Sequence, residues 1–243
     1  MLNLVQTEFL KLRRRKFIWL MLLGALFMPL VAILYFGTSN TSEISPMQFY
    51  KWTAFSYTMW IILPLVLGML CTMLMYDENQ NDMLKQLWII PVSRMGYIFS
   101  KFAVVLLYSI CFMLFTAVSS IFAGVIPGII VLTRDSVSFL LIKCLEIGLL
   151  IPFAIIPILA VAASQKGYIL PVCVTIVYTF FGFVLLMVKM YLHPLSSTTA
   201  IIMRNIDGVI LNEAISIGKS FLCIGIWGIA SIIWAKIALG NRK

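Results

Sequence analysis

A carboxylate and an ammonium group stand close together inside a long apolar run. Lys143 and Glu146 are the only charged residues between positions 136 and 163. On a helix they lie one turn apart, so they can form an ion pair. A carboxylate inside a bilayer is costly unless it is paired or faces water. Two interpretations stay open: the two residues form a structural ion pair, or Glu146 faces a cavity or a subunit interface on the substrate path, where it meets a cationic substrate.

No other group of residues has the types and spacing that catalysis or metal binding requires. Gly218-Lys219-Ser220 resembles the end of a phosphate-binding loop, but Glu213 occupies the place of the first glycine, and such a loop also needs a strand before it. His193 is the only histidine, and the five cysteines lie in apolar runs without the spacing of a disulfide scaffold or a metal site. We therefore expect no catalytic residue, no metal and no cofactor in this chain.

The composition identifies the bilayer as the main solvent of the chain. Hydrophobic residues make up 62% of the sequence and charged residues 11%, whereas a soluble domain has about 25% charged residues. A membrane span needs about 20 apolar residues, and six runs are long enough. They predict an all-α polytopic membrane protein with a single permease domain over residues 1–243. The expected spans are residues 17–36, 53–76, 98–126, 136–163, 168–192 and 220–239.

The basic residues lie mainly at the ends of the apolar runs. The net charge is +9, but this placement fits lipid headgroups and not nucleic acid. With the N-terminus inside, twice as many Lys and Arg residues fall on the inner side as fall elsewhere. Both termini are therefore expected in the cytoplasm.

Three segments lie outside the spans. In residues 1–16, apolar residues recur at helical spacing ahead of a basic cluster, which predicts an amphipathic helix in the inner headgroup layer. A cleaved signal peptide is disfavoured, because the apolar run that follows is too long. Residues 37–52 are expected to form a polar outer loop. Residues 193–219 carry too many charges to span, so we expect them to rest on the outer leaflet or to dip partly back into it.

A polar segment between the second and third spans, residues 77–101, has a helical pattern of its own. Its apolar residues Leu84, Leu87 and Trp88 fall on one face of a short helix. A proline ends that helix, and Ser93 can cap the next one. Such an apolar face fits either a partner protein or the lipid interface, and the pattern alone does not separate the two.

The whole chain resembles the permease subunits of type-2 ABC exporters, and most of all the small permeases that give immunity to lantibiotic and bacitracin-type peptides. The resemblance rests on the six-span layout and on motifs near the inner surface. These motifs are Glu8-Phe9-x-Lys11 before a basic cluster, Glu78, Pro91-Val92-Ser93-Arg94, and Lys101. The resemblance implies that the short helix is a coupling helix on the cytoplasmic side. The coupling residues would be Glu78, Leu84, Leu87, Trp88 and Arg94.

The same resemblance implies the partners. A separate ABC ATP-binding subunit, present in two copies, would hold ATP and Mg²⁺, and a second permease, identical or different, would complete a dimer. The expected function is removal of an amphipathic antimicrobial peptide from the plasma membrane of a bacterium, which gives immunity or antibiotic resistance. The alternatives are export of lipid or of another amphipathic drug, a binding partner that moves nothing, and an ion-coupled secondary transporter. The last would show more ionisable residues in its spans, or paired broken helices.

Overall fold

A computed structural model describes residues 2–13, 15–38, 45–80, 93–204, 206 and 215–240. Within these ranges the chain is helical and contains no strand, which confirms the predicted all-α class. Six helical stretches of this described part are long and apolar enough to cross a membrane. They run over Lys16–Gly37, Pro46–Glu78, Arg94–Val125, Arg134–Ser164, Ile169–Val188 and Ile217–Gly240.

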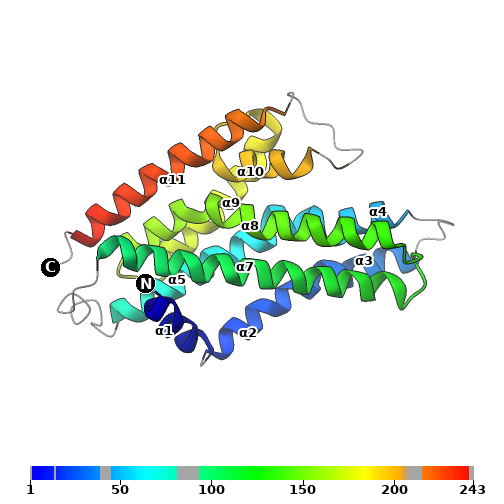
Figure 1. Cartoon of the computed structure of the whole chain (residues 1–243), viewed down its shortest axis with the longest axis horizontal. Helices are drawn as coiled ribbons and strands as arrows, with labels where there is room; N and C mark the ends of the chain where they lie inside the picture. Colours follow the sequence, from blue (N-terminus) through cyan, green and yellow to red (C-terminus); the bar gives the residue numbers. More distant parts are fainter. Residues whose placement is uncertain are drawn as a thin grey trace.

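Short helices and irregular turns join or interrupt the spans, and Figure 1 labels the main ones. The first span contains a 3₁₀ segment, η1, and the second contains two π-helical segments, η2 and η3. The elements are α1 (Leu2–Arg13), α2 (Lys16–Leu22), η1 (Leu23–Leu26), α3 (Phe27–Thr38), α4 (Pro46–Tyr50), η2 (Lys51–Phe55), η3 (Thr58–Ile62), α5 (Leu63–Gln80), α7 (Arg94–Val125), α8 (Arg134–Ser164), α9 (Ile169–Val188), α10 (Pro194–Met203) and α11 (Ile217–Gly240).

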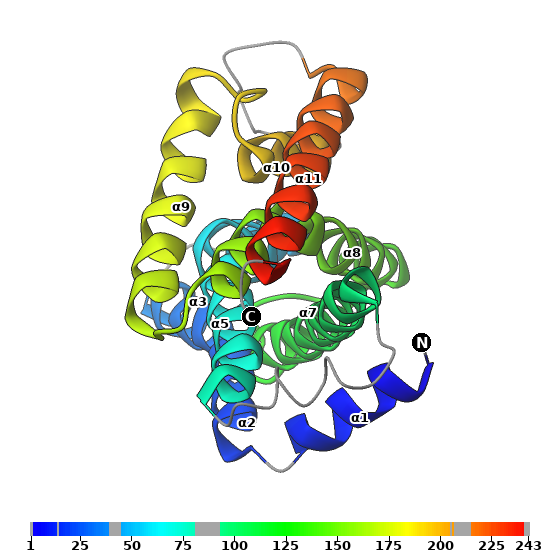
Figure 2. The same ribbon diagram turned by 90° about the vertical axis from the view of Figure 1, so that its left-hand side faces the viewer.

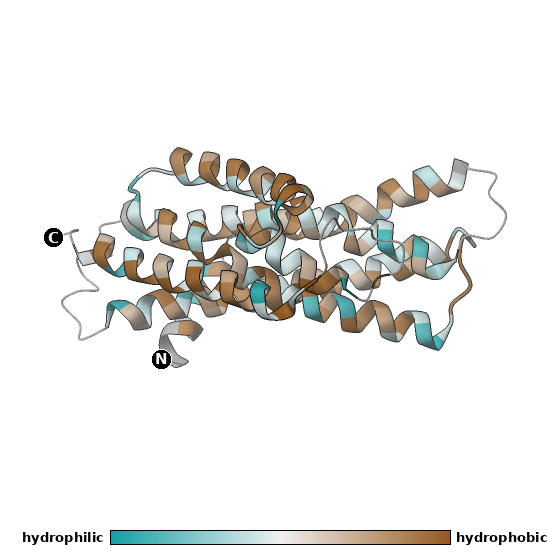
Figure 3. Ribbon diagram, turned by 90° about the horizontal axis from the view of Figure 1, so that it is seen from above, coloured by the Kyte–Doolittle hydropathy of each residue, from teal (hydrophilic) through white to brown (hydrophobic). Residues whose placement is uncertain are grey.

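The helix α1 and the C-terminal end of α11 lie at the same end of the molecule. The C-terminal end of α11 lies at the end where α1 is found (Figure 1), and α1 lies across the bundle there instead of along it (Figure 2). Apolar residues follow the helices along their length (Figure 3), and many large ones, such as Leu34 and Ile169, are exposed. An apolar exterior of this kind is solvated by lipid tails.

The second span begins earlier than its hydropathy predicts. The prediction of a polar loop over residues 37–52 is wrong at both ends, because α3 continues to Thr38 and α4 begins at Pro46. The Ser45 hydroxyl accepts a hydrogen bond from the Gln48 N–H at 3.3 Å, and Pro46 has no N–H that would need a partner at the first helical position. These local cap signals start the helix, and hydropathy does not record them.

The fifth span is shorter than predicted, and the chain then turns back. α9 ends at Val188 and not near residue 192. The following turn brings the His193 ring to 4.2 Å from the Tyr178 ring of α9. All ten residues of α10 are buried, and α10 contacts α8, α9 and α11. α10 therefore packs back against the spans, and the dip of the outer segment into the membrane stays a prediction; residues 205 and 207–214 of this segment lie outside the described ranges.

Candidate functional site

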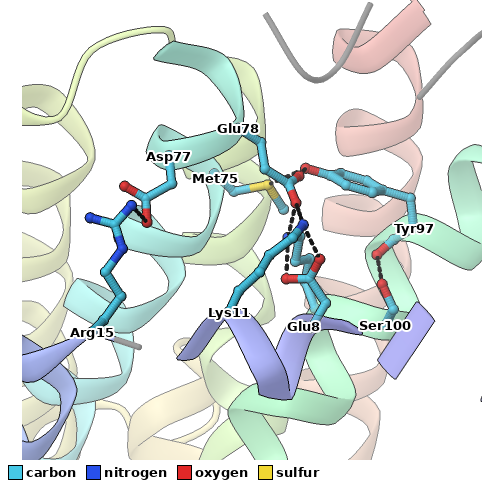
Figure 4. A network of polar contacts seen from close by, with 9 residues as sticks. Glu8, Lys11, Arg15, Met75, Asp77, Glu78, Tyr97 and Ser100 are labelled. Carbon is cyan, nitrogen blue, oxygen red and sulfur yellow. Dashed lines mark hydrogen bonds and ion pairs between the residues drawn. The ribbon is translucent and has the colours of Figure 1, made fainter. Parts of the chain in front are cut away.

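Four charged side chains from three helices meet at the end of the molecule where α1 lies. Glu8 and Lys11 belong to α1, Glu78 to α5 and Lys101 to α7. The Lys101 Nζ lies 2.5 Å from Glu8 Oε2 and 2.6 Å from Glu78 Oε1. The Lys11 Nζ lies 2.9 Å from Glu8 Oε1 and 2.7 Å from Glu78 Oε1. Each ammonium group contacts both carboxylates, so the four charges cancel; Figure 4 shows Lys11 beside Glu8 and Glu78. We call these four residues the ion cluster.

Three side chains of the ion cluster are buried, and the fourth is partly exposed. The side chains of Lys101, Glu78 and Glu8 are 1%, 3% and 6% exposed, whereas that of Lys11 is 44% exposed. The Tyr97 hydroxyl donates a hydrogen bond to the second oxygen of Glu78, and the Lys101 ammonium lies 5.2 Å from the centre of the Tyr97 ring. Because water is excluded, loss of one partner would leave an uncompensated buried charge, which is strongly destabilising.

Lys11 completes the charge balance from the exposed side. Its burial by itself would lower its pKa. The hydrogen bonds from Lys11 to Glu78 and Glu8, together with the two negative charges, outweigh this effect, so the pKa of Lys11 lies above its usual 10.5. Lys11 is therefore positively charged at neutral pH.

The ion cluster joins the two flanks of residues 81–92, which lie outside the described ranges. Glu78 precedes this segment and Lys101 follows it, and the two are in direct contact. The start of α7 is fixed by Ser93, whose hydroxyl accepts a hydrogen bond from the Gly96 N–H at 3.1 Å; this confirms the predicted cap. Because α1 supplies the other two charges, buried ion pairs connect both flanks to α1.

A second ion pair lies beside the cluster. The Arg15 Nη2 lies 3.1 Å from Asp77 Oδ2. The Arg15 side chain is half exposed, so the pair is worth at most about 1 kcal/mol. Its role is positional, since it holds the turn between α1 and α2 against the end of α5.

The predicted coupling residues fall in three places. Glu78 is a member of the ion cluster. Arg94 lies instead against the C-terminal end of α11, where a Cβ built on Gly240 would come within 2.9 Å of the Arg94 Nη1. The remaining three residues lie outside the described ranges; they are Leu84, Leu87 and Trp88. Their coupling role stays a prediction.

Sequence reasoning missed Tyr97, and it gave Glu8, Lys11 and Lys101 only as family motifs without a common location. A signal was available for Tyr97 and Lys101. They are four residues apart and so share a helix face, and a lysine just inside a span needs a partner. In the ranges that the structure describes, no group of His, Cys, Asp and Glu side chains could hold a metal ion.

The ion pair between Lys143 and Glu146 is formed, and it also holds α10. Lys143 Nζ lies 2.7 Å from Glu146 Oε2, and their side chains are 4% and 20% exposed. Lys143 also donates a hydrogen bond to the Ile202 carbonyl near the end of α10, at 2.9 Å. The Arg204 Nη2 lies 3.7 Å from the other oxygen of Glu146. The geometry fits the structural interpretation, and a place on the substrate path stays a prediction.

Replacing Glu146 by glutamine is expected to lower the free energy of unfolding by about 2 kcal/mol, because the buried Lys143 ammonium loses its charged acceptor. Export and membrane abundance should then fall together with stability, which is measured by SDS titration in mixed micelles. Asp135→Asn is the matched control, since it makes the same change at an exposed position of α8. If Glu146→Gln lowers export while its stability equals that of Asp135→Asn, the carboxylate acts on the substrate path.

The comparison with known families covers most of the chain. The sequence pattern of the ABC-2 family transporter protein matches residues 4–182, a range that contains every member of the ion cluster. No curated protein matches the sequence. Permeases of this family work with a separate ABC ATP-binding subunit, and the six apolar helices identify a multi-pass membrane protein. The chain therefore belongs to the ABC-2 family of transporter proteins, as a membrane permease that works with an ABC ATP-binding partner.

Proposed function

We propose that this permease exports an amphipathic antimicrobial peptide of the lantibiotic or bacitracin type, and so gives its cell immunity or resistance. Membership of the ABC-2 family supports ATP-driven export. The observation that carries the mechanism is the ion cluster, because it links the flanks of residues 81–92 to α1. The apolar exterior of the spans supports a substrate that enters from the bilayer.

The mechanism begins in the partner subunits. ATP binding closes them, and residues 81–92, through the apolar face predicted for them, follow that motion. Glu78 and Lys101 bracket the segment, so α5 and α7 move with it. Glu8 and Lys11 transmit the movement to α1, which lies across the ends of the spans. A peptide taken up from the membrane is thereby moved outward.

The complex contains two ATP-binding subunits, which hold ATP and Mg²⁺, and a second permease, identical or different. Both termini and residues 81–92 lie in the cytoplasm of a bacterium, and the spans cross its plasma membrane. The basic residues Lys11, Arg15 and Arg94 gather at the α1 end, and an excess of Lys and Arg marks the cytoplasmic side of a membrane protein.

Replacing Trp88 by glutamate is expected to abolish resistance while the permease remains in the membrane, because a charge in the docking face would prevent the ATP-binding subunit from seating. The measurement is purification of the tagged chain in mild detergent, followed by mass spectrometry of what accompanies it. Gln86→Glu is the matched control, since it adds the same charge on the opposite face of the predicted short helix. Co-purification of the ATPase should be lost in Trp88→Glu and kept in Gln86→Glu. Unchanged resistance in Trp88→Glu would falsify the docking role.

Transport into inverted vesicles separates the substrate classes. ATP-dependent accumulation of a labelled lantibiotic supports the proposal. ATP-dependent transport of lipid or of an amphipathic drug, without transport of the peptide, indicates an exporter of that substrate class. Accumulation that needs an ion gradient and no ATP indicates a secondary carrier, and peptide binding without accumulation indicates a regulatory partner.

A further inference from the structure

A cavity of about 510 Å³ lies between α8, α9 and α11. One wall is a face of α9 from Cys173 to Phe181, and the other is a face of α11 from Trp227 to Trp234. α8 closes the cavity with residues that include Pro157. At 1.5 Å per residue, the walls extend for about 10–12 Å along the helices. A hydrocarbon chain that lies along the helices fits walls of this length.

The cavity offers a ligand almost nothing polar. The Tyr178 hydroxyl donates its hydrogen bond to the Ala154 carbonyl, and the Ser231 hydroxyl donates to the Trp227 carbonyl. His193 uses its Nδ1 as an acceptor at the start of α10, and burial lowers the pKa of His193 to about 4, so the ring is uncharged at neutral pH. A ligand with hydrogen-bonding groups at this depth would leave them unsatisfied. The cavity therefore accepts hydrocarbon.

The cavity opens sideways, toward the surroundings of the spans. Phe181 and Trp234, on opposite walls, are both more than half exposed. Figure 2 shows α9 and α11 as separate walls with α10 between their far ends. A hydrocarbon chain in the bilayer can enter between these walls without crossing the protein.

Two lysines stand above the cavity at the end that faces away from α1. Lys189 follows the last residue of α9, and Lys219 lies in the first turn of α11; both are exposed. The two helices run in opposite directions, so both lysines are at the same end. Each is eight residues, about 12 Å, from the nearest cavity residue of its helix, Phe181 or Trp227. A positive pair at the level of the headgroups complements an anionic lipid.

We propose that this cavity holds the hydrocarbon tail of an anionic phospholipid from the leaflet that faces away from α1, with the headgroup between Lys189 and Lys219. The inference goes beyond the proposed peptide export and does not depend on it. The chain also provides an internal comparison. A second apolar cavity, of about 340 Å³, lies between α3 and α7, is lined by Pro29 and Phe122, and is on other helices than the two lysines.

The test uses the full chain, purified with whatever subunits accompany it, in vesicles that contain phosphatidylglycerol with a photoreactive group in its tail. Phosphatidylcholine with the same tail is the uncharged comparison. Phosphatidylglycerol is expected to label residues 173–181 and 227–234 more strongly. Lys189→Gln and Lys219→Gln should each reduce this preference about fivefold. Lys236→Gln, at the other end of α11 and also exposed, should leave it unchanged.

Two filling variants test the cavity itself. Val177→Trp places a large ring between the walls, so labelling of residues 227–234 by both lipids should be lost. Val118→Trp makes the same change in the second cavity and should leave that labelling intact. Neither position is buried, so both variants are expected to fold.

Three results would overturn the proposal. Equal labelling by the two lipids in the wild type would remove the role of the lysines. Labelling spread evenly over all exposed helix faces, and unchanged by Val177→Trp, would show ordinary solvating lipid only. No labelling of residues 173–181 and 227–234 by either lipid would show that lipid does not occupy the cavity.

Discussion

Replacing Lys101 by methionine is expected to lower the free energy of unfolding by about 3–5 kcal/mol. The Lys101 ammonium lies within 2.6 Å of an oxygen of both Glu8 and Glu78, and its side chain is almost wholly buried. Without it, two buried carboxylates share one partly exposed ammonium group, that of Lys11. One negative charge is then left without a partner in a site that excludes water. Such an uncompensated buried charge strongly destabilises the folded state.

The comparison variants separate charge balance from loss of a side chain. Stability is measured by SDS titration of the purified variants in mixed micelles. Lys166→Met removes an exposed lysine and should change the free energy by less than about 0.5 kcal/mol. Adding Glu8→Gln to Lys101→Met restores neutrality and should recover part of the loss. If Lys101→Met is as stable as Lys166→Met, or if Glu8→Gln deepens the loss, charge balance in the ion cluster does not stabilise the fold.

The spans are readable from the sequence because their signal is local. A helix in a bilayer must be apolar over about 20 residues, whatever it packs against. The predicted span 136–163 and the observed Arg134–Ser164 therefore differ by no more than two residues at either end. The end of the fifth span is predicted less accurately. The chain turns back after Val188 into α10, which is itself buried and largely apolar. Lys189 marks the turn, but the apolar residues 190–192 that follow it extend the predicted span.

The ion cluster could not be derived from spacing, because its contacts join distant parts of the chain. Lys101 and Glu8 are 93 residues apart, and Lys11 and Glu78 are 67 apart. A sequence shows which charges lie near a membrane surface, but not which helix ends meet there. The family resemblance named these residues as a motif. The physical reason, a neutral set of four charges with Tyr97 on one carboxylate, required the structure.

Replacing Gly68 by valine is expected to destabilise the permease by about 3 kcal/mol or more through overpacking. Gly68 lies in α5 where it crosses α9. A Cβ built on Gly68 would come 2.1 Å from the Cγ2 and 2.7 Å from the Oγ1 of Thr175. Thr175 is fully buried, and its hydroxyl donates to the Pro171 carbonyl at 2.8 Å. Even the Thr175 Cβ would lie only 3.0 Å from the new atom, so a change of rotamer at Thr175 does not remove the overlap and the two helices must separate.

The same SDS titration, with two further variants, identifies the contact that fails. Gly225→Val is the matched control, since nothing lies within 4 Å of a Cβ built on Gly225 of α11; its stability should stay within about 0.5 kcal/mol of the wild type. Thr175→Ala removes both atoms that the new side chain would strike, so adding it to Gly68→Val should recover part of the loss. Equal stability of Gly68→Val and Gly225→Val would mean that α5 and α9 do not cross closely at this glycine. A loss that Thr175→Ala does not relieve would place the strain elsewhere on α5, the helix whose last turns carry Glu78 into the ion cluster.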